Sequence, residues 1–129
     1  GLRLDGDEAA LRQHYTQADS AAEKLLALDS LKKFPALSPT SQDFIRQIAP
    51  DWQSKTETGC LTELLYQIDP EQYEQFLAAR WQAGIYDKVI YELYHTPGDK
   101  QALANRWYER ILAKLPDIEP KTYCTEAAS

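Results

Sequence analysis

Apolar residues along this chain recur at the three- and four-residue spacing that is typical of amphipathic helices. The clearest such stripe consists of Leu61, Leu64, Leu65 and Ile68. No stretch alternates apolar and polar residues as a half-buried strand does, and the chain has a single valine, Val89. The pattern therefore predicts an all-α protein.

The N-terminal part, residues 7–34, is rich in residues that favour helices: alanine, leucine, glutamine, glutamate and lysine. It predicts either one long helix or a pair of helices with a break near Asp19 and Ser20, and Pro35 ends the helical run. We expect the buried side of this part to consist of Ala22, Leu25, Leu26, Leu28 and Leu31.

Helix start signals divide the rest of the chain. Ser38 followed by Pro39 is typical of an N-cap with proline in the first turn, and a short helix should follow it. Asp69 followed by Pro70 is the strongest signal of this kind in the chain. Further helices are predicted over residues 60–68, 70–84, 86–95 and 100–115.

The connections between these predicted helices are short, and short connections make successive helices antiparallel neighbours. We therefore expect a single helical domain over residues 1–129, built as a bundle or array of five to seven antiparallel helices. Residues 39–115 form the short-loop helices of this scheme, and residues 116–129 form a tail with little apolar content.

Composition and charge exclude several classes of protein. Aromatic residues make up 11% of the chain, which argues against disorder. The 20 acidic and 14 basic residues give a net charge of −6, which argues against a broad nucleic-acid surface. No apolar run approaches the roughly 18 residues that cross a bilayer, so we expect no direct membrane insertion.

The two cysteines, Cys60 and Cys124, are too few for a structural zinc site without help from histidine, and neither histidine is near them in sequence. We predict that they form a disulfide, because a cysteine in a polar tail has no packing role there. Such a bridge would fasten the tail and would place the protein in an oxidising compartment. We therefore expect a periplasmic or secreted protein whose signal sequence is not among these residues; the alternative is two unpaired thiols in the cytosol.

Candidate chemistry is sparse. Glu92 and His95 form a Glu-x-x-His pair, the motif that di-iron helical bundles use twice, but the chain holds one copy. The five glycines are scattered singly, so no phosphate-binding loop is expected, and no nucleophile motif surrounds a serine or a cysteine. We expect no metal and no cofactor, and we favour a role other than catalysis.

Tyrosines and tryptophans are abundant in residues 70–115, and these are the side chains that often anchor protein interfaces. In the predicted helix 86–95, Val89 and Leu93 mark the buried row, so Tyr91 should point outward. The alternative is that most of these rings only pack in the core. The residues that we predict to bind a partner are Tyr86, Tyr91, Tyr94, Asp87 and Glu92.

These observations favour a small acidic helical protein that acts by binding another protein, in the manner of an inhibitor, an immunity protein or an adaptor. The acidic charge would speed its association with a basic partner. Two alternatives stay open: a helical enzyme or small-ligand carrier with a carboxylate- or aromatic-lined cleft, and a soluble accessory subunit of a membrane complex.

Overall fold

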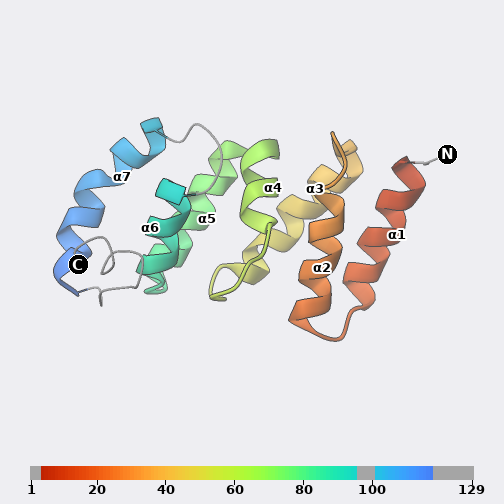
Figure 1. Cartoon of the computed structure of the whole chain (residues 1–129), viewed down its shortest axis with the longest axis horizontal. Helices are drawn as coiled ribbons and strands as arrows, with labels where there is room; N and C mark the ends of the chain where they lie inside the picture. The colour runs from red at the N-terminus through yellow and green to blue at the C-terminus, as the bar shows by residue number, and fades with distance from the viewer. Residues whose placement is uncertain (1–3, 96–100, 118–129) are drawn as a thin grey trace. The chain divides into compact units, whose positions relative to one another are not determined.

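The structure of the chain is a computed structural model that describes residues 4–95 and 101–117. Those residues form seven α-helices and contain no strand, which confirms the all-α prediction. In chain order the elements are α1 (Leu4–Gln17), α2 (Ala21–Leu31), α3 (Pro39–Ile48), the 3₁₀ turn η1 (Ala49–Trp52), α4 (Leu61–Ile68), α5 (Pro70–Gln82), α6 (Tyr86–His95), α7 (Gln101–Lys114) and the 3₁₀ turn η2 (Leu115–Asp117) (Figure 1).

The chain divides into two compact units, Gly1–Ala79 and Arg80–Ser129, and the division falls within α5. The first unit holds α1 to α4 and most of α5. The second unit holds the end of α5 together with α6 and α7. The single domain expected over residues 1–129 stays a prediction.

Helices α1 and α2 form a hairpin in the first unit, so the N-terminal part is a helix pair with its break at residues 18–20 (Figure 1). Ser20 is the N-cap of α2, and its hydroxyl accepts a hydrogen bond from the Glu23 N–H at 3.2 Å. The ammonium group of Lys24 donates a hydrogen bond to the Tyr15 carbonyl at 2.9 Å, which ties α2 to the end of α1.

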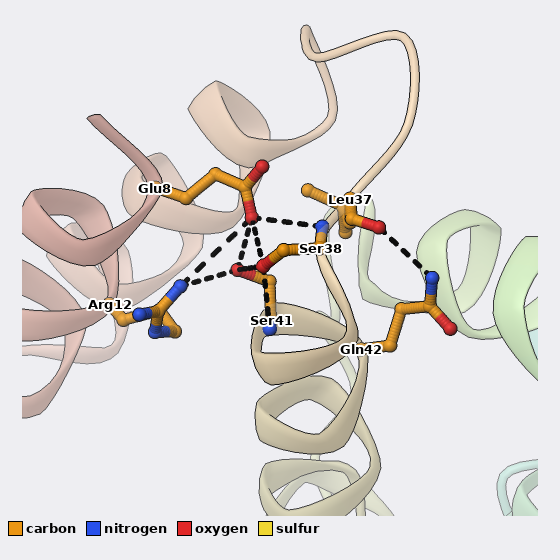
Figure 2. A network of polar contacts seen from close by, with 6 residues as sticks. All are labelled: Glu8, Arg12, Leu37, Ser38, Ser41 and Gln42. Atoms are coloured by element: carbon orange, nitrogen blue, oxygen red, sulfur yellow. Dashed lines mark hydrogen bonds and ion pairs between the residues drawn. The ribbon is translucent and has the colours of Figure 1, made fainter. Parts of the chain in front are cut away.

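Helix α3 starts as the sequence predicts, with Ser38 as the N-cap and Pro39 in the first turn. The Glu8 carboxylate of α1 reaches this start from thirty residues away and is 1% exposed. One of its oxygens, Oε1, accepts hydrogen bonds from the Ser38 N–H at 3.1 Å, the Ser38 hydroxyl at 2.8 Å and the Ser41 hydroxyl at 2.5 Å. Figure 2 shows this network, in which Arg12 also donates to the Ser41 hydroxyl at 2.6 Å.

Burial alone would raise the pKa of Glu8, but the hydrogen bonds from Ser41 and Ser38 outweigh it, and the positive charge of Arg12 adds to their effect. The net result is a lowered pKa, so Glu8 is a charged carboxylate at neutral pH. A negative charge at a helix N-terminus also interacts favourably with the helix dipole. The network therefore fixes α1 against the start of α3.

A second long-range hydrogen bond joins η1 to α1. The indole Nε1–H of Trp52 donates to the Tyr15 hydroxyl at 2.6 Å, and the Trp52 side chain is 2% exposed. The Trp52 ring therefore packs in the core of the first unit.

Helix α4 buries Leu61, Leu64 and Leu65 of the predicted stripe, whereas its fourth residue, Ile68, is only half-buried. Asp69 then caps α5, because its Oδ1 accepts a hydrogen bond from the Gln72 N–H at 3.1 Å. Its other oxygen accepts a hydrogen bond from Arg46 Nε at 3.2 Å, so the same carboxylate links the start of α5 to α3. The hydrogen bond from the Gln72 N–H has the largest effect on the pKa of Asp69 and lowers it, and Arg46 lowers it further. Together they outweigh burial, which raises it.

The core of the second unit is built around two indole rings. Trp81 and Trp107 are buried with their ring centroids 5.5 Å apart, in an edge-to-face arrangement. Gly84 ends the preceding helix with a positive φ of 86°, a conformation that favours glycine. Val89 and Leu93 of α6 are buried in this unit, as are Leu103, Ala104, Trp107 and Ile111 of α7.

Candidate functional site

The five residues predicted to bind a partner lie on α6, but their side chains differ in solvent exposure. Tyr91 and Tyr94 are 48% and 51% exposed, so Tyr91 points outward as the helix pattern predicts. Tyr86 is half-buried, with its ring against Trp81 at a centroid distance of 4.8 Å. Asp87 and Glu92 are half-buried too. Whether these residues bind a partner stays a prediction.

A row of exposed apolar side chains on α7 and η2 was not predicted. Tyr108, Leu112 and Leu115 are 55%, 47% and 48% exposed. Their spacing of four and three residues places them along one side of the helix. We call these three residues the α7 row. The sequence signal was present, since α7 carries apolar residues on more than its one buried stripe.

The first unit contains an open groove along α2, which we call the α2 groove. Its volume is about 610 Å³, and its lining consists of Ala22, Leu25, Leu26, Asp29, Lys32, Gly59, Cys60 and Glu63. The buried side predicted for α2 was therefore wrong in part. Leu28 and Leu31 are fully buried, but Leu26 is 65% exposed and Ala22 is exposed too.

Gly59 allows the wall of the groove to lie close to α2. Its φ is +54°, in the left-handed region, and a Cβ at this position would lie 3.2 Å from Leu25 Cδ2. Any larger residue would therefore meet both backbone strain and a crowded neighbour.

Polar groups line one part of the α2 groove. Lys32 Nζ lies 2.5 Å from Glu63 Oε2, and this contact raises the pKa of Lys32. The Cys60 thiol donates a hydrogen bond to Asp29 Oδ1 at 3.2 Å. Burial, followed by the bond to Asp29, raises the pKa of Cys60 to about 11. Because the reactive form of cysteine is the thiolate, this environment does not favour a nucleophile.

Cys60 is a free, buried thiol in the structure, and Cys124 lies outside the described residues. The predicted disulfide between them therefore stays a prediction.

Two further cavities of the first unit are smaller than typical ligand sites. They measure about 240 Å³ beside the start of α5 and about 210 Å³ beside η1, against roughly 300–1,000 Å³ for typical small-molecule pockets. Within the described ranges, no group of three or more histidine, cysteine or acidic side chains is placed to hold a metal ion. His95 belongs to α6, but its side chain lies outside what the structure describes.

The acidic charge of the protein is unevenly distributed between the units. Residues 1–79 contain 13 acidic and 7 basic residues, a net charge of −6, whereas residues 80–129 contain 7 of each. The exposed tyrosines and the α7 row therefore belong to the neutral unit. The α2 groove belongs to the acidic one.

Comparisons with protein families, with curated proteins and with solved structures found no match to this chain. Among the described residues, no helix combines the length and the apolar character needed to cross a membrane.

Proposed function

We propose that this protein acts by binding another protein, as an inhibitor, an immunity protein or an adaptor does. The observation that carries the proposal is the exposure of large apolar side chains in the second unit. Tyr91 and Tyr94 on α6 and the three residues of the α7 row are each between 47% and 55% exposed. Tyrosine is enriched among the side chains that anchor protein interfaces.

The arrangement of α6 and α7 supports this role, because each helix has a separate buried side. Val89 and Leu93 bury one side of α6, and Trp107 and Ile111 bury one side of α7. The exposed rings thus lie outside these buried rows, which supports a role for them in contacting another protein.

We also propose that the protein works in the periplasm or outside the cell, with Cys124 bridged to Cys60. Support comes from the position of Cys124 in a polar tail. The bridge would replace the hydrogen bond between the Cys60 thiol and Asp29. Intact-mass analysis of the non-reduced protein tests it: a bridged chain is lighter by two hydrogen masses than the reduced chain, and two free thiols after aerobic purification would remove the case for this compartment.

The binding role is tested by affinity capture of the tagged protein from cells of its source, with the bound proteins quantified by mass spectrometry. We expect one stoichiometric partner, whose recovery falls several-fold for Tyr91→Ala or Leu112→Ala. Arg106→Ala is the matched control, because Arg106 is exposed on another side of α7. A partner recovered equally with all variants would move the interface away from these helices, and the absence of any stoichiometric partner would refute the role.

A further inference from the structure

Helix α2 has apolar residues on two sides, and the first unit covers one of them. Ala27, Leu28 and Leu31 are 2% exposed or less and face the core. Leu25 and Leu26 lie on the other side and line the α2 groove. Leu25 and Leu26 therefore lack the cover that the core gives to Leu28 and Leu31, although Asp29 places a charge beside them.

The shape of the groove fits a helical occupant. The lining residues on this side run from Ala22, Leu25, Leu26 and Asp29 of α2 to its C-cap, Lys32, so the groove follows the helix for about 15 Å. The Leu26 side chain, 65% exposed, is the most exposed large apolar residue in the described chain. A partner helix of three to four turns would cover it with an apolar stripe, in the helix-in-groove mode of recognition.

Charge distinguishes between the candidate occupants. Asp29 and Glu63 lie at the groove, and the charge of Lys32 is matched by Glu63 at 2.5 Å. The unit as a whole has a net charge of −6. A second copy of the chain would bring two such acidic surfaces together, and their repulsion opposes that arrangement. A basic helix is attracted instead.

We propose that the α2 groove binds an amphipathic helix of a partner protein, whose apolar stripe covers Leu25 and Leu26 and whose lysines or arginines face Asp29 and the acidic surface around it. The proposal specifies a kind of partner for the protein-binding role and rests on that role. It uses a surface of the first unit, so variants of α6 and α7 test the two proposals separately.

The test uses a defined probe, a fluorescently labelled 14-residue peptide of leucine and lysine with leucines at helical spacing. Its affinity for the whole chain is measured by fluorescence anisotropy. We expect Leu26→Gln to weaken binding by about tenfold, as expected for loss of a central apolar anchor. Leu26 is largely exposed, so this variant should fold, and circular dichroism confirms that it does. Leu112→Gln, a similar change at an exposed leucine of the second unit, should leave the affinity unchanged.

The charge requirement has its own control and its own variant. A peptide with glutamate in place of every lysine should bind at least tenfold more weakly than the lysine peptide, because its negative charges are repelled by the acidic first unit. In the reduced protein, Asp29→Asn should weaken binding of the lysine peptide and reduce its dependence on salt, while the side-chain oxygen of Asn still accepts the Cys60 hydrogen bond.

Several outcomes overturn the proposal. One is equal affinity of the lysine peptide for the wild-type chain and Leu26→Gln, and another is tight binding of the glutamate peptide. A concentration-dependent dimer that Leu26→Gln abolishes, measured by sedimentation, would assign the groove to a second copy of the chain. Peptide binding that appears only after a reductant is added would assign the groove to the segment that carries Cys124, because a bridge to Cys60 in the groove wall would hold that segment there.

Discussion

Replacing Glu8 by alanine removes the acceptor that three donors share at the start of α3. The Ser38 N–H and the Ser38 and Ser41 hydroxyls all donate to Glu8 Oε1, and the carboxylate is 1% exposed. A buried donor left without its partner costs about 1–3 kcal/mol, and removing one member of a buried charged network costs about 3–5 kcal/mol. Part of this loss is recovered, because the two serine hydroxyls can bond one another and Arg12 still reaches Ser41.

We therefore expect Glu8→Ala to lower the free energy of unfolding of the first unit by about 3 kcal/mol. Glu8→Gln keeps an acceptor oxygen and the size of the side chain but loses the charge, so its cost should be about 1 kcal/mol. Urea denaturation followed by circular dichroism gives the overall loss. Hydrogen exchange with mass spectrometry locates this loss. Relative to the wild type, Glu8→Ala should raise the exchange rates of peptides from α1 and from the first turn of α3 more than those of peptides from α6 and α7.

The matched control is Asp7→Ala, which removes a carboxylate from the neighbouring position of the same helix. Asp7 is half-buried and has no polar contact in the described structure, so its replacement should change stability by less than about 0.5 kcal/mol. If Glu8→Ala is as stable as Asp7→Ala, the carboxylate does not hold α1 against α3 and the reasoning is wrong. Equal exchange rates in α1 for the wild type and Glu8→Ala would lead to the same conclusion.

Three further predictions concern pH, the core and the thiol. Because the pKa of Glu8 is lowered in the folded protein, its contribution to stability is full above the ordinary glutamate pKa of 4.5 and is lost as the pH falls through the lower folded pKa. Acid titration followed by circular dichroism should therefore show a smaller loss of stability for Glu8→Gln than for the wild type. In urea denaturation, Leu28→Ala, at a fully buried position, should lower the free energy of unfolding by about 2–5 kcal/mol, whereas Leu26→Ala should lower it by less than about 0.5 kcal/mol. Similar losses for the two variants would mean that another side of α2 faces the core. In the reduced protein, the Cys60 thiol, with its pKa of about 11, should react with iodoacetamide at neutral pH much more slowly than after unfolding, and fast reaction would contradict its burial.

Local signals explain why most of the helices could be predicted. Ser38 with Pro39 and Asp69 with Pro70 act within one turn of the backbone, so the sequence alone places the starts of α3 and α5. Helix α6 has one apolar row, and its bounds and the exposure of Tyr91 follow from that row.

Long-range effects explain what the sequence did not reveal. Glu8 resembles any solvated acid of an N-terminal helix, and its burial depends on residues thirty positions away. In α2, the apolar residues surround the helix, so periodicity does not select a buried side and Leu26 was placed in the core. The α7 row was missed for the same reason, because a second apolar stripe becomes evident only once Trp107 and Ile111 occupy the first one.

The placement of the three tryptophans provides a spectroscopic reporter in each unit. Trp81 and Trp107 lie 5.5 Å apart in the second unit, so their electronic transitions couple and should give a paired circular dichroism signal from that unit. Trp52 is the one tryptophan of the first unit, and its indole is hydrogen-bonded to Tyr15. Its fluorescence therefore follows the packing of η1 against α1. The paired circular dichroism signal therefore reports the packing of the second unit without an added label.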